Sequence, residues 1–271
     1  MQKKEKAGFN MKRVIAAAAF LPLFISYIYF LPPFPFFLIL LLIVGMLAMR
    51  EFYIMYRVPA SLYIPAVVIG GILFYYFCRY PEYFPECVFV GLFLILLLRL
   101  FVIKLPSGSM SEVGPLGVGL FYIAGFLSFQ WFLRTENEGL KYIFLLYASV
   151  WLADSAAYYV GSYLGKNKLY PSVSPNKTVE GALGSLMGGA VGSVVVKNAM
   201  GITGLSTVGA LAIGMTIGIA TLLGDLIESM FKRDAGVKDS SGLIPGHGGI
   251  LDKIDGFLIS GPILYLIVRY M

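Results

Sequence analysis

The carboxylates that could do chemistry gather in the C-terminal half of the chain. Eight of the 15 acidic residues lie between residues 154 and 255. Asp225 and Glu228 are three residues apart, the spacing that puts two side chains on one face of a helix. Ser229 and Lys232 continue that face. Carboxylates close together repel one another unless a cation neutralises them, and oxygen ligands alone favour Mg²⁺ or a similar hard ion.

A second acidic pair, Asp252 and Asp255, has the same spacing and begins the last apolar segment, where a helix N-terminus favours anions. Basic residues alternate with the two acidic pairs along the chain; they are Lys232, Arg233, Lys238 and Lys253. Phosphoryl or nucleotidyl transfer requires acids that can hold a metal ion and, beside them, Lys and Arg residues that can hold anions. These residues have that arrangement.

A glycine-rich loop, residues 240–249, connects the acidic pairs. Its glycines let backbone N–H groups approach phosphate oxygens. The loop contains His247, which is the only histidine of the chain, and the chain has only two cysteines. The usual zinc sites built from Cys and His are therefore excluded. His247 has either a direct role in the site or a structural hydrogen-bonding role.

Another polar segment, residues 174–181, precedes a further apolar run. Ser174 or Thr178 can cap the helix that follows, and Lys177 can meet a phosphate group. We therefore expect this segment to contribute to substrate binding.

The elements that must position these residues are membrane helices. The chain has 271 residues, of which 58% are hydrophobic and 13% charged, and its mean hydropathy is +0.81. A soluble domain has about 25% charged residues, so the composition excludes an ordinary soluble enzyme as well as a disordered chain. The expected fold class is an all-α, polytopic integral membrane bundle. The net charge is +6, but the basic residues form no stripe along the sequence. We therefore expect no nucleic-acid partner.

Nine apolar runs predict nine transmembrane helices; they lie at about 14–30, 34–49, 61–77, 87–103, 114–133, 140–163, 181–197, 206–230 and 254–270. With the N-terminus in the cytoplasm, sixteen of the 21 basic residues fall on the cytoplasmic side, as membrane proteins require. The C-terminus then lies outside, and the polar motifs face the cytoplasm. We expect a single membrane unit with N-terminal helices at 1–140 and motif-bearing helices at 141–271.

Three features inside these runs leave alternatives open. Asp154 belongs either to the site or to an ion pair between helices. The glycine faces formed by Gly184, Gly188 and Gly192 and by Gly214 and Gly218 favour close packing within the chain, with a homodimer seam as the alternative. Cys78 and Cys87 flank a short loop, where two free thiols are favoured over a disulfide.

The run from Ser229 to Asp255 resembles the signature of phosphatidate cytidylyltransferases, also called CDP-diglyceride synthases. That signature consists of Ser-x-apolar-Lys-Arg, four residues, Lys-Asp, a Pro-x-His-Gly-Gly turn and Asp-Arg-apolar-Asp. The matching residues include Ser229, Phe231, Lys232, Arg233, Lys238, Asp239, Pro245, His247, Gly248, Gly249, Asp252 and Asp255. The resemblance is firm over about residues 150–260. One departure is Lys253, where the family has Arg; lysine keeps the charge and loses the two-pronged contact with phosphate.

The resemblance implies that CTP and phosphatidate are converted to CDP-diacylglycerol and pyrophosphate for phospholipid biosynthesis, at a bacterial-type cell membrane. We predict Asp225 and Asp252 as ligands of Mg²⁺, with a second cation as an option. The predicted catalytic residues are Asp225, Lys232, Arg233, Lys238, Asp239, His247, Asp252, Lys253 and Asp255. The predicted substrate-binding residues are Ser174, Lys177, Thr178, Glu180, Ser229, Gly248 and Gly249.

Two other functions are compatible with these residues. A CTP-dependent kinase of lipid alcohols would use similar residues and release CDP rather than pyrophosphate. A cation-coupled transporter would account for the intramembrane acids Asp154 and Asp225, although the sequence shows no convincing inverted repeat.

Overall fold

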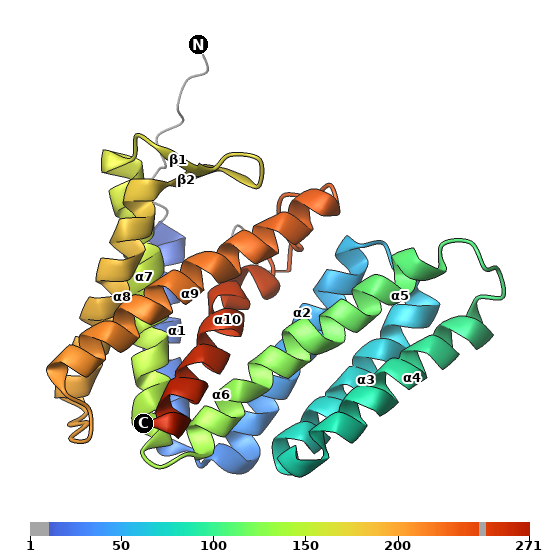
Figure 1. Ribbon diagram of the computed structural model, residues 1–271, viewed down its shortest axis with the longest axis horizontal. Coiled ribbons are helices and arrows are strands. Elements are labelled where there is room, and N and C mark those ends of the chain that lie inside the picture. The colour runs from blue at the N-terminus through green and yellow to red at the C-terminus, as the bar shows by residue number, and fades with distance from the viewer. Residues whose placement is uncertain (1–10, 244–247) are drawn as a thin grey trace.

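Long helices that run up and down through the molecule make up almost the whole structure (Figure 1). The computed structural model describes residues 11–243 and 248–271. Within these residues the helices are α1 (Met11–Phe30), η1 (Pro33–Phe37) with α2 (Leu38–Met55), α3 (Ala60–Arg79), η2 (Pro81–Tyr83) with α4 (Phe84–Val102), α5 (Ser109–Val118) with η3 (Gly119–Gly125) and α6 (Phe126–Thr135), α7 (Gly139–Leu164), α8 (Val179–Ala199), α9 (Thr207–Asp234) and α10 (Leu251–Tyr270).

These helices match the nine apolar runs one for one, with η1–α2, η2–α4 and α5–η3–α6 each forming a single crossing. Seven of the crossings in the described part are long and apolar enough to span a membrane. The other two are α1 and α10, and α10 has charged residues at both ends, Asp252 and Arg269 among them. The predicted all-α membrane bundle is confirmed.

A short hairpin between α7 and α8 is the one sheet among the described residues. Strand β1 (Lys168–Tyr170) pairs antiparallel with β2 (Ser174–Thr178), so that Lys168 lies opposite Thr178 and Tyr170 opposite Ser174. The sequence predicted only a polar stretch here. The hairpin lies across one end of the bundle (Figure 1), and the site described below lies at that end.

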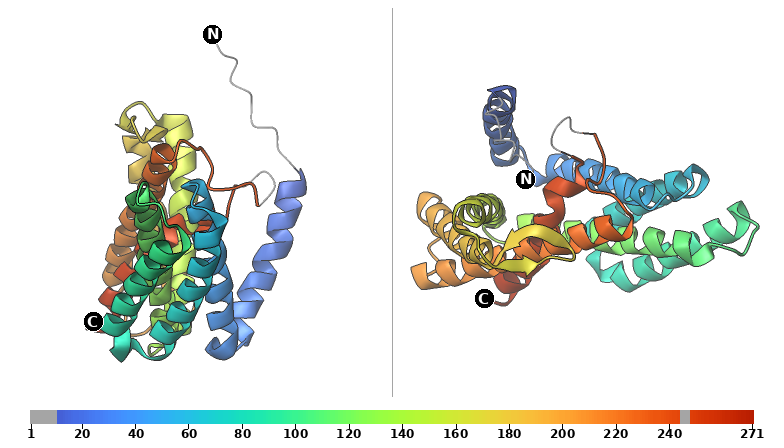
Figure 2. Two further views of the ribbon diagram at one scale, coloured as in Figure 1. Left: turned by 90° about the vertical axis from the view of Figure 1, so that its right-hand side faces the viewer. Right: turned by 90° about the horizontal axis from the view of Figure 1, so that it is seen from above.

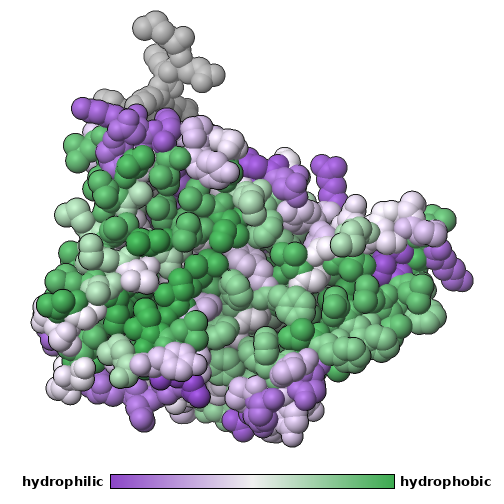
Figure 3. Space-filling view, viewed as in Figure 1, coloured by the Kyte–Doolittle hydropathy of each residue, from purple (hydrophilic) through white to green (hydrophobic). Residues whose placement is uncertain are grey.

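The basic loops share this end of the molecule. The α2–α3 and α4–α5 connections and the loop between α9 and α10 lie at the same end as the hairpin, whereas the C-terminus lies at the opposite end (Figure 1). On the face shown in Figure 3, hydrophilic residues gather at the two ends and hydrophobic residues cover the region between. The connections between the crossings therefore alternate between the two ends of the bundle, as the positions of the basic residues predicted. The assignment of one end to the cytoplasm stays a prediction.

Helices α7, α8 and α9 pack with their backbones in contact. A Cβ atom on Gly188 would collide with the main chain of Leu152 in α7, and one on Gly189 would collide with that of Gly214 in α9. Larger residues would force these helices apart. The glycine faces are therefore used within the chain, as the favoured interpretation had it, and a homodimer stays a prediction.

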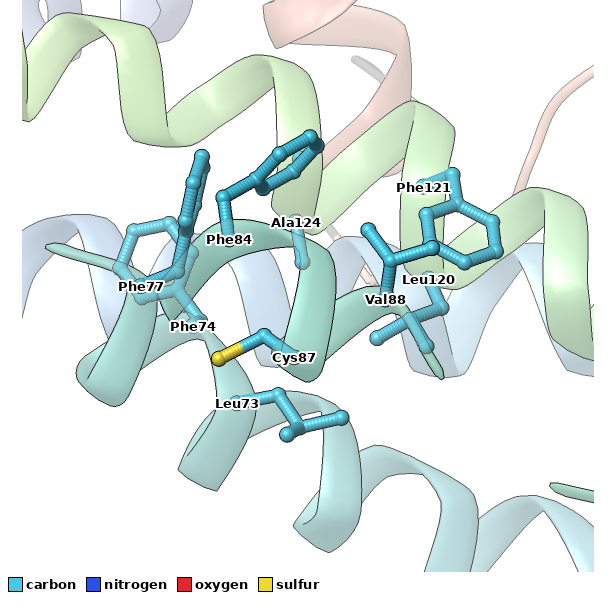
Figure 4. A pocket seen from close by; sticks show the side chains of 10 residues that line it. Leu73, Phe74, Phe77, Phe84, Cys87, Val88, Leu120, Phe121 and Ala124 are labelled. Atoms are coloured by element: carbon cyan, nitrogen blue, oxygen red, sulfur yellow. The ribbon is translucent and has the colours of Figure 1, made fainter. Parts of the chain in front are cut away.

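The N-terminal helices α3 and α4 pack through large side chains. They lie at the edge of the bundle, away from α8 (Figures 1 and 2). A small apolar cavity of about 40 Å³ lies between α3, α4 and η3 and is lined by Phe74, Phe77, Cys87 and Leu120 among others (Figure 4). Cys78 and Cys87 are both free thiols, as favoured from the sequence.

Candidate active site

The crossing of α9 and α10 brings two carboxylates together. At Gly224 the helices approach so closely that a Cβ atom would collide with the carbonyl of Asp255. The next residue of α9 is Asp225, which is thereby placed beside Asp255. One carboxylate oxygen from each of Asp225, Glu228 and Asp255 lies within 4.8 Å of the others. We call these three residues the acidic triad.

Glu228 is the most enclosed member of the acidic triad. Its exposure is 0%, and one carboxylate oxygen, Oε2, forms an ion pair with Lys232. The other oxygen, Oε1, makes no hydrogen bond among the described residues. A buried carboxylate oxygen without a partner is costly, and three converging carboxylates repel one another. Because the donors are all oxygen atoms, the acidic triad fits a hard divalent cation such as Mg²⁺.

The β1–β2 hairpin supplies Lys177 to the acidic triad. The Nζ atom of Lys177 lies 2.7 Å from Oδ2 of Asp225. At the base of the hairpin, the hydroxyl of Thr178 caps α8 by accepting a hydrogen bond from the Gly181 N–H at 3.1 Å. Glu180 accepts hydrogen bonds from the backbone N–H groups of Lys166 and Asn167. Thr178 and Glu180 therefore hold the hairpin that positions Lys177.

Asp252 lies in a different environment. Its Oδ1 accepts a hydrogen bond from Lys232 Nζ at 2.7 Å. Its Oδ2 accepts bonds from the Ser240 hydroxyl at 2.8 Å and from the Gly249 N–H at 2.7 Å. Lys232 thus links Asp252 to Glu228, and the structure brings Asp225 together with Glu228 and Asp255 rather than with Asp252. The pair Asp225 and Asp252 as metal ligands stays a prediction, and Glu228 is an acid that the predicted ligand set lacked.

Of the remaining predicted residues that the structure describes, only Ser229 makes a direct contact with the acidic triad. Ser229 is buried and donates a hydrogen bond to Asp225 at 3.3 Å. Arg233 donates to the carbonyl groups of Val173 and Val237 at 3.2 Å, which links α9 to the hairpin turn. Ser174, the first residue of β2, is half-buried. Lys238, Asp239 and Lys253 are exposed, and in the described part of the chain they form no ion pair.

The glycine-rich loop is partly described. Gly248 has a φ of +83°, where glycine is favoured, and a Cβ atom there would meet Asp252. The N–H of Gly249 donates to Asp252, so this group already has a partner within the chain. His247 lies outside the described residues.

Two further residues lie near the acidic triad: one whose role the sequence left undecided, and one that the sequence did not single out. Asp154 is exposed and within electrostatic range of Asp225, Lys177 and Lys253, so it lies on the site side of α7. The hydroxyl of Tyr122 in η3 is in range of Asp255 and Glu228 and makes no hydrogen bond among the described residues. A tyrosine inside an apolar run gave no sequence signal. Glu51 of α2 was also missed.

The fold and the site define a polytopic membrane protein with a lysine-flanked acidic site at one end of its bundle. Residues 11–271 match the sequence profile of the Cytidylyltransferase family, and the chain belongs to this family.

Its relatives include proteins named phosphatidate cytidylyltransferase. The protein of Bacillus subtilis (strain 168) is 38% identical over 183 residues, which cover 66% of this chain and 67% of the relative. That of Synechocystis sp. is 43% identical over 185 residues, covering 66% of this chain and 60% of the relative. That of Staphylococcus haemolyticus is 41% identical over 145 residues, covering 54% of this chain and 55% of the relative. The matches thus span between about half and two thirds of these relatives.

Proposed function

We propose that this chain is a phosphatidate cytidylyltransferase, which transfers the cytidine monophosphate unit of CTP to phosphatidate and releases pyrophosphate. The observation that carries the proposal is the acidic triad with Lys177 and Lys232 bound to two of its members. Three carboxylates and adjacent lysines are suited to bind a nucleoside triphosphate together with a divalent cation. The family and the names of the relatives support the choice of CTP and phosphatidate as substrates.

The reaction needs little acid–base chemistry from the protein. A phosphate monoester has a second pKa of about 6, so the lipid phosphate is largely a dianion at neutral pH. One of its oxygens attacks the α-phosphorus of CTP, and the bond from that phosphorus to the bridging oxygen of the β-phosphate breaks. Pyrophosphate leaves with the bond electrons. No proton has to be removed from the nucleophile, so positioning and charge neutralisation provide the catalysis.

The residues divide this work by charge. Asp225, Glu228 and Asp255 are the proposed ligands of Mg²⁺, which when bound supplies positive charge to the phosphates of CTP. Lys232, with Arg233, Lys238 and Lys253 as further cations, is proposed to neutralise the triphosphate and the departing pyrophosphate. Lys177, on the hairpin, contacts Asp225, and we propose that it binds the lipid phosphate.

The location of the site at one end of the bundle suits its two substrates. CTP is water-soluble and phosphatidate stays in the bilayer, so the reacting groups must meet at a membrane surface. The positive-inside rule places the end with the basic loops in the cytoplasm. We propose a cell membrane of the bacterial type as the location, with the site on the cytoplasmic side.

The test uses the purified full-length chain with phosphatidate vesicles, Mg²⁺ and CTP labelled either in the cytidine or in the γ-phosphate. The expected result is cytidine label in the lipid and γ-label in pyrophosphate. In parallel vesicles that contain a lipid alcohol, transfer of the γ-label to that alcohol with release of CDP would instead identify a lipid kinase. Cation flux into liposomes without consumption of CTP would identify a transporter.

A further inference from the structure

Glu51, at the end of α2, contacts the loop that carries the motif although it lies about 190 residues earlier in the chain. Its Oε1 accepts hydrogen bonds from the Ser241 hydroxyl at 2.7 Å and the Ile250 N–H at 3.0 Å. Its Oε2 accepts bonds from the Ser240 hydroxyl at 3.2 Å and the Leu251 N–H at 2.9 Å. Each carboxylate oxygen therefore binds one N–H at the start of α10 and contacts one hydroxyl of the loop, and the single proton of the Ser240 hydroxyl is shared with Asp252, which is closer at 2.8 Å.

This carboxylate is buried without a basic partner. Its exposure is 1%, and it forms no ion pair with a described Lys or Arg residue. Its charge is stabilised by the hydrogen bonds from Ser241, Ile250 and Leu251, by the shared hydroxyl of Ser240, and by the positive end of the α10 helix dipole. A Cβ atom on Gly249 would collide with this carboxylate, so Gly249 packs directly against it. A buried charge held in this way fixes the position of every group that binds it.

One of these groups connects Glu51 to the site. The hydroxyl of Ser240 lies within hydrogen-bonding distance of both Glu51 and Asp252. Glu51 also fixes Leu251, the residue before Asp252. Asp252 in turn binds Lys232, which forms the ion pair with Glu228 of the acidic triad. A continuous series of polar contacts therefore leads from α2 to the acidic triad.

We propose that Glu51 is a positioning residue of the transfer reaction. By fixing Ser240 and the first turn of α10 it sets the orientation of Asp252, which holds Lys232 at the acidic triad, where the charge of the triphosphate is neutralised. Glu51 is enclosed and does not touch substrate. This inference rests on the proposed function, and its specific content is that the N-terminal half supplies an essential contact to the site.

The sharpest test is Glu51→Gln in the full-length protein. Glutamine has the same shape, but its amide NH₂ group replaces one acceptor oxygen and faces a backbone N–H that cannot turn away. We expect kcat for cytidine transfer to fall about 10-fold or more, with a smaller change in the KM for phosphatidate. The matched control is Glu112→Gln, which breaks the contact between Glu112 and Arg99 elsewhere in the same half and is expected to keep kcat within about twofold per folded molecule.

A double-mutant cycle with Lys232→Met separates positioning from general stability. If Glu51 acts through Lys232, Glu51→Gln will have little further effect in the Lys232→Met background. An equal fold-loss in both backgrounds would overturn the proposal, as would equal losses for Glu51→Gln and Glu112→Gln.

Ser241→Ala provides a second variant should Glu51→Gln not fold. It removes one donor to Glu51 and leaves the charge in place. We expect a two- to fivefold fall in kcat, again much smaller in the Lys232→Met background, together with faster hydrogen exchange at the Ile250 and Leu251 amides. Unchanged kcat would contradict the proposal. Absence of cytidine transfer in the wild-type protein would instead contradict the proposed function itself.

Discussion

Helix α8 in the C-terminal half and helix α4 in the N-terminal half pack in different ways. In α8, glycines bring neighbouring backbones into contact, and 50% of its apolar span is buried within the chain. In the crossing that contains α4, only 17% of the span is buried, which leaves most of its large side chains to the lipid. Backbone contacts leave little freedom for side chains to readjust. The helices beside the candidate site, α7, α8 and α9, are therefore fixed by backbone contacts, whereas α4 packs through its side chains.

The largest expected effect is that of Asp225→Asn, which removes a carboxylate from the acidic triad. We expect cytidine incorporation into lipid to fall about 100-fold or more, because charge stabilisation at the reacting phosphates is lost. Binding of Mg²⁺ to the purified protein, measured by calorimetry, should weaken in parallel.

The control for Asp225→Asn is Asp234→Asn at the end of the same helix. Asp234 accepts a hydrogen bond from Tyr56 at 2.9 Å. Burial and the Asp234 carboxylate raise the pKa of the Tyr56 hydroxyl well above its usual value, so the tyrosine stays a neutral donor that an amide oxygen can also accept. Activity within about twofold of wild type is expected. Equal losses in the two variants would show that any charge removed from α9 is harmful.

A smaller effect is expected for Lys177→Gln on the hairpin. Its ammonium group is the one cation that contacts Asp225 in the described structure, so a loss of about 10-fold in kcat/KM for phosphatidate is expected. Lys168→Gln, on the partner strand and exposed, should change the rate by less than twofold. If Lys168→Gln has the larger effect, the hairpin contributes through its overall charge and not through Lys177.

Two glycine substitutions test the packing difference directly. Gly188→Ala adds a Cβ atom that would collide with the α7 backbone, and we expect a loss of about 1–3 kcal/mol in unfolding free energy. Gly117→Ala in α5 meets nothing within 4 Å, so its helix propensity should raise stability by about 0.5–1 kcal/mol. Thermal unfolding in a fixed detergent measures both. Similar Tm values would remove the distinction between the two regions.

The smallest effect is expected for Lys253→Arg, which restores the residue found in the family. Lys253 is exposed, and the described residues offer it no ion pair. A change in kcat/KM for CTP of less than about threefold would indicate that a single charge is enough. A rise of 10-fold or more would mean that the two-pronged contact of arginine is needed.

The nine crossings were predictable because apolar length is a strong signal, and the basic loops located the end that holds the motif. The hairpin was not predictable, since strands of three and five residues in a polar stretch show no alternation. Glu51 follows Arg50 at the end of an apolar run, where a charge is normal at a membrane surface. Nothing local distinguishes it from a solvated residue.

The sequence also could not predict which of the acids converge in the acidic triad. The i, i+3 spacing correctly placed Asp225 and Glu228 on one face. Asp252 and Asp255 lie one turn apart on α10, and which of them meets that face depends on where the helices cross. Gly224 sets that crossing next to Asp255. The tertiary contact, and not the motif, selects the third member of the acidic triad.

The pairing of β1 with β2 has a consequence for how this chain can vary. Side chains alternate between the two faces of a strand, so a shift of one residue along β2 would turn Lys177 away from Asp225 and present Asn176 or Thr178 in its place. The hairpin is held at both ends, by the contacts of Glu180 at the α8 end and by Arg233, which binds the Val173 carbonyl in the turn. Insertions at residues 171–173 are thus expected to displace the Val173 carbonyl from Arg233, and deletion of a single residue within Ser174–Thr178 would replace the cation beside Asp225 with a neutral group.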